Sequence, residues 1–336
     1  MASQLEDGPV TSGFEDIRLI NDSLPELNLD EIDLSLNFLG KDLQYPLMVN
    51  ALTGGTDQAL NINRSLARMA LKYGLPMAVG SQSVALEFPE ATMSFSIVRE
   101  VNPNGIILAN LNAAAGVKEA LQAVRMISAD ALQLHFNVVQ ELAMAEGDRN
   151  FKGIRENIRQ IVKECPVPVI AKEVGFGFSR EAANSLMEAG IEIFDCSGQG
   201  GTNFILIEDQ RGGHFAGELN SWGIPTAISL IELLQLPTRR VIASGGIRSA
   251  ADAAKALALG ADLVGMAAPL LKTFLSGGLE ALDQSLSGFF YRLKAVFLMS
   301  GARNLHEIRQ KPLIILREIA EYLRLRGIDP SYWARR

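Results

Sequence analysis

The chain has 336 residues, of which 48% are hydrophobic, and its formal net charge is −7. This acidic balance leaves no basic surface to neutralise a phosphate backbone, so a nucleic acid is not an expected partner. No apolar run reaches the roughly 18 residues that a membrane span needs, and the first ten residues contain Glu6 and Asp7 but no Lys or Arg, unlike a targeting peptide. The two cysteines, Cys165 and Cys196, form no CxxC pair. We therefore expect a cytoplasmic protein without disulfides, structural zinc or membrane contact.

Eight short apolar runs recur along the chain, with longer helix-compatible segments between them. This pattern is typical of parallel strands that are buried on both faces. The predicted strands cover residues 46–53, 77–81, 105–111, 131–137, 167–175, 191–198, 240–246 and 262–267. Eight strand and helix alternations favour an α/β fold of the (β/α)8 TIM barrel class, although eight strands in an open, doubly wound sheet would fit the same pattern.

The segments around these strands predict helices and two extensions. Apolar spacing of three and four predicts crossover helices over residues 157–165, 180–189 and 250–259, with Ser179 and Ser249 as N-caps and Gly190 and Gly260 as closing glycines. Alternation over residues 14–40 predicts an extended lid on the barrel bottom, and residues 279–298 and 312–326 are predicted to form additional helices. We expect a single domain: an N-terminal extension (1–45), the barrel (46–276) and C-terminal helices (277–336).

Polar and glycine-rich segments follow the predicted strands. The active site of a (β/α)8 barrel lies at the carboxyl ends of its strands, so these segments are the first candidates for a functional site. GQGGTN (198–203), ASGGIR (243–248) and GMAA (265–268) predict a phosphate site, because bare backbone N–H groups and a helix N-terminus bind anions. SGG after a strand would also fit a simple tight turn.

Two strand ends carry side chains suited to chemistry. Lys172 ends an apolar strand, so its ammonium needs a partner that stabilises a buried cation, such as an anionic flavin edge; a salt bridge to Glu173 or another acid is the alternative. His135 and Asn137 share one strand face, and Gln140 and Glu141 follow within a few residues. So many polar residues at one strand end favour a functional site over a hydrogen-bonded core histidine. The Glu141 carboxylate could hold Mg2+ while substrate phosphates complete the octahedron.

These motifs together resemble a known family. NALTGG, AVGSQ, ANL, HFNVVQE, EGDR, KEVGFG, GGTNF, SWGI, SGGIR and KALALGADLVGMA occur in the order and spacing of type 2 isopentenyl diphosphate isomerases, from about Gly13 to the C-terminal helices. SGGIR is shared by many flavin barrels, whereas NVVQE with EGDR and KEVGFG is specific. The resemblance implies FMN, Mg2+ and a reductant such as NADPH, with isopentenyl diphosphate converted to dimethylallyl diphosphate. It also implies a homo-oligomer, a tetramer or larger.

The resemblance carries over to individual positions. Gln140 is implied to contact the substrate and Glu141 to bind Mg2+, with His135 and Asn137 at the diphosphate end; Gln140, His135 and Asn137 are the candidate catalytic residues. The implied flavin contacts are Ala51, Leu52, Thr53, Ser81, Asn110, Lys172, Ser197, Thr202, Gly246, Ile247, Arg248, Ala267 and Ala268.

The chain departs from the family pattern at several positions. Family members usually begin with a basic Arg-Lys arm followed by a histidine, whereas nothing comparable precedes Gly13, and Glu6 and Asp7 stand there instead. We therefore expect either a truncated start or weak capture of the substrate diphosphate. The chain also has Asn112 where the family often has glycine, Phe136 for leucine, and Ala145 for the proline before EGDR.

Two other functions fit part of the pattern. Another FMN barrel oxidoreductase, such as a 2-hydroxy acid oxidase, shares SGGIR and a strand-end lysine, but it needs a catalytic histidine and arginine pair late in the chain, and we find none. A flavin-binding relative with weakened isomerase activity would explain the departure at the N-terminus.

Overall fold

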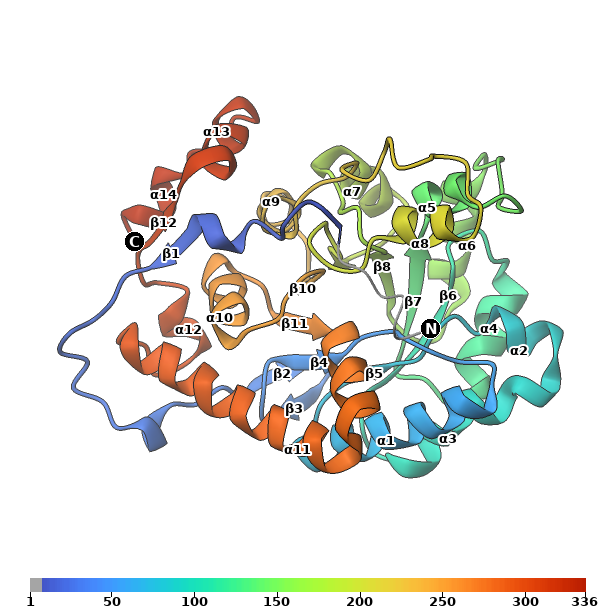
Figure 1. The fold of residues 1–336 in the computed structure, drawn as a ribbon, viewed down its shortest axis with the longest axis horizontal. Helices are drawn as coiled ribbons and strands as arrows, with labels where there is room; N and C mark the ends of the chain where they lie inside the picture. Colours follow the sequence, from blue (N-terminus) through green and yellow to red (C-terminus); the bar gives the residue numbers. More distant parts are fainter. Residues whose placement is uncertain (1–7) are drawn as a thin grey trace.

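The computed structural model describes residues 8–336, so Glu6 and Asp7, on which the expected N-terminal charge depends, lie outside the described residues. At its centre eight parallel strands close into a barrel, each paired with its neighbours in chain order (Figure 1). The strands are β4 (Leu47–Val49), β5 (Met77–Ala78), β6 (Ile107–Asn112), β7 (Ala131–Phe136), β8 (Val169–Glu173), β9 (Ile193–Asp195), β10 (Arg240–Ser244) and β11 (Leu263–Met266). The closed barrel confirms the predicted fold class and excludes the open sheet.

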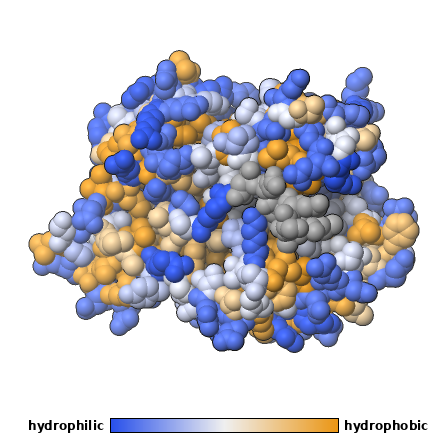
Figure 2. Space-filling view, in the orientation of Figure 1, coloured by the Kyte–Doolittle hydropathy of each residue, from blue (hydrophilic) through white to orange (hydrophobic). Residues whose placement is uncertain are grey.

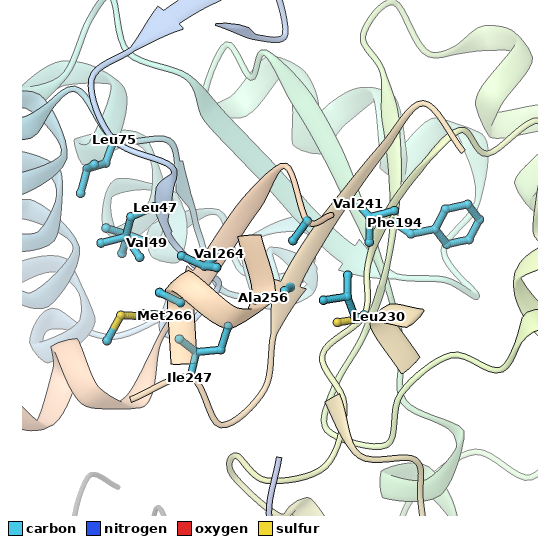
Figure 3. Packing of buried hydrophobic residues seen from close by; sticks show 14 of the residues in the cluster. Leu47, Val49, Leu75, Phe194, Leu230, Val241, Ile247, Ala256, Val264 and Met266 are labelled. Carbon is cyan, nitrogen blue, oxygen red and sulfur yellow. The ribbon is translucent and has the colours of Figure 1, made fainter. Parts of the chain in front are cut away.

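Both faces of the barrel strands are buried, which explains why they appear in the sequence as continuous apolar runs. In β4, the outward residues Leu47 and Val49 pack with Val264 of the neighbouring β11 (Figure 3). The inward residues form a separate cluster with one member from each strand. They are Met48, Ala78, Leu108, Ala131, Ile170, Ile193, Ile242 and Leu263.

A short hairpin closes the amino-terminal end of the barrel. Strands β2 (Leu36–Phe38) and β3 (Lys41–Leu43) pair antiparallel, and Phe38 and Leu43 join the inward cluster, with 0% and 5% of their surfaces exposed. Lys41 Nζ donates to Asp130 Oδ1 at 2.8 Å and to two carbonyl groups of a neighbouring loop. The predicted lid therefore exists, but the hairpin forms it rather than the whole of residues 14–40.

Helices surround the barrel, and the three crossover helices predicted from apolar spacing are present (Figure 1). The caps are those expected: Ser179 and Ser249 accept from backbone N–H groups in the first turns of α7 and α10.

None of the helices in residues 8–336 has both the length and the apolar character that crossing a membrane requires. The helices between barrel strands are α1 (Asp57–Tyr73), α2 (Ser83–Glu87), α3 (Met93–Val101), α4 (Val117–Met126), α5 (Val138–Ala143), α6 (Ile154–Glu164), α7 (Arg180–Glu188), α8 (Phe204–Gln210), α9 (Thr226–Leu233) and α10 (Ala250–Leu259), with the 3₁₀ turn η4 (Pro89–Thr92).

The C-terminal region differs in part from the prediction. The expected helix over residues 279–298 is the second part of α11 (Ala268–Met299), which bends at Gly278 where φ is +68°. The expected helix over 312–326 is wrong at its start, because β12 (Leu313–Ile315) pairs antiparallel with β1 (Ile17–Leu19) before α13 (Arg317–Leu325) begins. Three apolar residues after a proline bury alternate side chains against β1, and this long-range pairing overrides the local helical spacing. The remaining short elements are η2 (Phe14–Asp16), η3 (Leu29–Glu31), α12 (Leu305–Ile308) and α14 (Ser331–Ala334).

Candidate active site

A cavity of about 710 Å³ lies at the carboxyl ends of the barrel strands, and residues from the end of each of the eight strands or from the segment after it contribute to its wall. Every residue predicted to contact flavin lines it, from Ala51 after the first strand to Ala268 after the eighth. His135 and Gln140 line it as well. Asn137 and Glu141 are not among the lining residues. The structure thus brings most of the predicted site together and leaves the predicted metal ligand beside it.

Two glycine-rich loops meet backbone to backbone at one side of the cavity. Gly245 and Gly246 have φ values of +95° and +72°, a region that favours glycine. A Cβ atom at Gly246 would lie 2.4 Å from the carbonyl oxygen of Gly200, and one at Gly245 would lie 2.3 Å from that of Gly198. Only glycine permits this approach, so the SGG segment does more than form a turn: it exposes main chain to the cavity.

The N-terminus of α11 faces the same part of the cavity. Ala267 and Ala268 line the cavity, and no side chain caps this helix. The neighbouring α10 is different, because Asp252 and Ser249 form a capping box that occupies its first turn. The first N–H groups of an uncapped helix need an acceptor, and an anion supplies one. The α11 N-terminus, the Gly246 loop and the adjacent Arg248 therefore fit a phosphate group.

Lys172 points from β8 into the cavity, and only 6% of its surface is exposed. Its ammonium donates to the Glu173 carbonyl at 2.9 Å and to Ser197 Oγ at 3.3 Å, and it lies 4.0 Å from Asp195 Oδ2. The Glu173 carboxylate instead accepts from the backbone N–H groups of Val174 and Phe176. The nearby acid is therefore Asp195 rather than Glu173, and the cavity side of Lys172 is open to a ligand.

His135 is a neutral residue of the cavity wall. Its ring Nδ1 lies 2.9 Å from Asn110 Oδ1, and with this carboxamide orientation the ring proton is on Nδ1. Burial, and then the positive charge of Lys172, lower the pKa of His135 from 6.5 to about 4. At neutral pH the imidazole can accept or donate a hydrogen bond, but it does not supply a positive charge.

The predicted metal ligand belongs to a hydrogen-bonded cluster at the start of α5. Glu141 Oε1 accepts from Asn137 Nδ2 at 2.7 Å, and Glu141 Oε2 accepts from the Asp148 backbone at 2.9 Å. Asn112 Nδ2 donates to Asn137 Oδ1 at 2.9 Å, so the asparagine that departs from the family pattern is part of this cluster. Residues 8–336 contain no group of three or more His, Cys, Asp or Glu side chains that could hold a metal alone. A single carboxylate fits Mg2+ only if water and substrate phosphates supply the other ligands.

Two buried acids of the candidate site were not predicted from the sequence. Glu208 lines the cavity with 3% of its surface exposed, accepts from Gln140 Nε2 at 3.0 Å, and pairs with Arg211 at 2.9 Å. The one signal in the sequence is spacing. Glu208 lies three residues after Ile205 on α8, so both side chains are on the same, buried face of the helix. Asp195 was also missed, although it follows the inward-facing Ile193 by two residues, and strand alternation alone indicates an inward carboxylate.

The late histidines do not supply an oxidase-type pair. His214 and His306 are exposed, and neither is among the described residues that line the cavity. His135 is the histidine that does, and it comes early in the chain.

Comparisons with known proteins identify the class of this barrel. A family model described as FMN-dependent dehydrogenase matches residues 90–315, so the chain has the barrel of that class of flavin proteins. Solved structures with this fold include a mandelate oxidase mutant with (S)-mandelic acid, which covers 94% of this chain and 93% of its own at a TM-score of 0.69 and 17% identity. A mutant of an active chimera of (S)-mandelate dehydrogenase covers 93% and 94% at a TM-score of 0.68 and 18% identity. At such low identity they show the fold alone.

Two relatives are far more similar in sequence. The chain is 48% identical over 320 residues to the isopentenyl-diphosphate delta-isomerase of Moorella thermoacetica, covering 95% of this chain and 92% of that protein. It is 47% identical over 322 residues to the protein of the same name from Symbiobacterium thermophilum, covering 95% and 89%. The chain belongs to the FMN-dependent, type 2 family of isopentenyl-diphosphate delta-isomerases.

We predict that His135 titrates far below neutral pH in the FMN-free protein. A 1H–13C NMR titration should give a midpoint near pH 4, assigned by loss of the signal in His135→Gln, and Lys172→Met should raise that midpoint. The unfolded chain binds more protons than the folded chain between about pH 6.5 and 4. The stability linked to a neutral His135 is therefore present above this range and lost as the pH falls through it. A midpoint above pH 6 would contradict this electrostatic account.

We predict that Gly246→Ala abolishes high-affinity FMN binding. The new Cβ must displace the loop that contains Gly200, and a displaced loop cannot present its backbone to a phosphate. Gly153→Ala is the matched control, because Gly153 also has a positive φ of +84° but no atom lies within 4 Å of its Cβ position. Both variants carry about 1–2 kcal/mol of backbone strain, but only Gly246→Ala should weaken FMN binding more than tenfold in a fluorescence titration. Equal FMN affinities in the two variants would rule out the loop contact.

Proposed function

We propose that this chain interconverts isopentenyl diphosphate and dimethylallyl diphosphate, using reduced FMN held in the barrel cavity and Mg2+, in isoprenoid biosynthesis. One observation carries the proposal: an uncapped helix N-terminus, a glycine loop and a buried lysine line one cavity in a chain nearly half identical to proteins named for this isomerisation. The 2-hydroxy acid oxidase alternative has no comparable support, because the cavity offers no late histidine.

The cofactor would be held by main chain at one end and by charge at the other. We assign the FMN phosphate to Gly246, Ile247, Arg248, Ala267 and Ala268. The remaining contacts we assign to the ring system and its chain. They are Ala51, Leu52, Thr53, Ser81, Asn110, Lys172, Ser197 and Thr202, all lining the cavity. Lys172 would place its positive charge beside the ring edge that becomes negative on reduction.

Moving a double bond requires one proton to be added and another removed in a pocket that excludes water. When bound and reduced, FMN supplies an electron-rich ring with nitrogen atoms that can exchange protons. The protein provides apolar walls for the hydrocarbon part of the substrate, from Leu52, Phe204 and Ile207. Gln140 would contact the substrate with its carboxamide held in one orientation by Glu208.

The diphosphate end would lie toward His135, Asn137 and Glu141. We propose that Glu141 binds Mg2+ through one carboxylate oxygen, with the substrate phosphates as the main ligands. Hydrogen bonds from Asn137 and from the Asp148 backbone already fix that carboxylate in place. The neutral His135 would line the diphosphate end through a hydrogen bond rather than as a counter-charge.

Further proposals follow from the family. NADPH would be the reductant, needed in catalytic amounts because the isomerisation is redox neutral. We propose one functional domain in the cytoplasm, supported by two cysteines that form no CxxC pair, and a homo-oligomer of four or more chains. Exposed hydrophobic residues support assembly: Figure 2 shows hydrophobic surface along α11, and on this helix Tyr291 and Met299 are 62% and 51% exposed.

The test is product analysis with FMN-loaded protein, sub-stoichiometric reductant, Mg2+ and isopentenyl diphosphate. We predict dimethylallyl diphosphate in many-fold excess over the reductant. Lys172→Ala should weaken FMN binding about tenfold or more, because a charge-assisted contact contributes about 1.5–3 kcal/mol. Glu141→Gln should spare FMN and lose most of the Mg2+-dependent activity.

The control for both variants is Glu188→Gln, an exposed carboxylate on α7 that should change neither property. No product from fully loaded, reduced protein would indicate a flavin-binding relative without isomerase activity. Steady NADPH consumption with a 2-hydroxy or keto acid would indicate the oxidoreductase instead. Equal loss of FMN in Lys172→Ala and Glu141→Gln would contradict the division of roles.

A further inference from the structure

A layer of polar side chains lies inside the barrel directly above the apolar layer, and the proposed function gives a role only to its members Asn110 and Lys172. On six strands, the residue two positions after the inward apolar one is polar. Barrel interiors are usually filled by branched apolar side chains. These polar residues expose between 0% and 6% of their surfaces. They are Asn50, Asn110, Gln133, Lys172, Asp195 and Ser244.

Asp195 is the centre of this layer. Its Oδ2 accepts from Asn50 Nδ2 at 2.7 Å and from Gln133 Nε2 at 3.4 Å, and its Oδ1 accepts from Ser244 Oγ. It exposes none of its surface and is not among the residues that line the cavity. A ligand in the cavity therefore does not touch the carboxylate.

The charge partner of Asp195 among the described residues is Lys172, whose Nζ lies 4.0 Å from Oδ2. A buried carboxylate and a buried ammonium are each costly alone, and removing one partner leaves the other as an uncompensated charge. The register pairs these two residues directly across β8 and β9. Each therefore stabilises the position of the other.

The same hydrogen-bonded chain reaches a second cavity residue. Gln133 Oε1 accepts from Asn110 Nδ2 at 3.3 Å, and Asn110 Oδ1 contacts the His135 ring at 2.9 Å. Asp195 is thus connected on one side to the cation and on the other to the neutral imidazole. A purely structural core would need neither connection.

We propose that Asp195 is a positioning residue of the cofactor site: from beneath the cavity it holds the Lys172 ammonium directed at the bound flavin. This rests on the proposed FMN site. The positive charge that faces the flavin then depends on a carboxylate that never contacts it. Removing that carboxylate leaves Lys172 without its buried counter-charge, so the ammonium loses the charge that holds it in this position.

The experiment compares Asp195→Asn, Lys172→Met and the double variant in the full chain. Dissociation constants are measured for oxidised and reduced FMN, and the two-electron potential of bound FMN is measured by dye equilibration. We expect Asp195→Asn to weaken binding of reduced relative to oxidised FMN about tenfold, which is a fall of about 30 mV in the two-electron potential. In the Lys172→Met background it should have no further effect, because the cation that it supports is absent.

A second variant and a control keep the test decisive. Gln133→Met removes one donor to Asp195 but leaves the charge, so it should shift the same ratio in the same direction by about threefold, again only when Lys172 is present. Asp130→Asn removes a carboxylate that pairs with Arg99 at 2.6 Å at the opposite end of the barrel. It should lower the melting temperature and leave the potential unchanged.

An unchanged or raised potential in Asp195→Asn, or an equal effect with and without Lys172, would overturn the proposal. If Asp195→Asn does not fold, Gln133→Met decides by the same criterion. A wild-type chain that binds no FMN would refute the proposed cofactor site itself, which is a different result from normal wild-type binding with an insensitive Asp195 variant.

Discussion

The inside of a closed barrel can be filled only by the inward side chain of every second residue, and this constraint arranges the whole molecule. In the lower layer those side chains are apolar, and the hairpin that carries Phe38 seals them from solvent. Two residues further along six of the strands, the inward side chains are polar and hydrogen-bonded, and above them the cavity opens. The amino-terminal end of the barrel therefore contributes stability and the carboxyl-terminal end contains the candidate site. The two inward layers are only two residues apart along a strand.

The charged groups around the cavity are arranged so that positive potential remains available to a ligand. Arg248 and the uncapped N-terminus of α11 offer positive potential at one side, and Lys172 offers it at another. The acids are kept from cancelling it: Asp252 caps the neighbouring α10, and Glu208 is engaged by Gln140 and Arg211. His135 is held neutral by burial and by Lys172. The result is a cavity suited to a phosphate and an anionic ring, with an apolar region left for a hydrocarbon.

The parts of this arrangement that depend on local pattern could be predicted from the sequence. Apolar runs predicted the barrel strands, and serine and glycine at the helix ends predicted the caps of α7 and α10. The segment after Pro312 was mispredicted because its strand forms only by pairing with β1, nearly 300 residues earlier in the chain. Glu208 was missed for a similar reason, since its partner Gln140 lies on another helix and no spacing within GGTNF indicates the contact.

The predicted positions of Asn137 and Glu141 differ from the structure for another reason. The sequence placed them with the cavity residues because they follow the same strand, but α5 starts at Val138 and carries Glu141 into a cluster with Asn112. Strand alternation predicts direction only as far as the strand continues. Beyond its end, the first turn of the helix decides which side chains face the cavity, and here it selects Gln140.

In the proposed complex, main chain binds the cofactor phosphate and Lys172 meets the cofactor ring. A crystal structure of the FMN-bound protein tests this most directly. We predict the phosphate within hydrogen-bond distance of the backbone N–H groups of Gly246 and Ala268, and the ring edge within hydrogen-bond distance of Lys172 Nζ. A phosphate held elsewhere, or a ring turned away from Lys172, would contradict it.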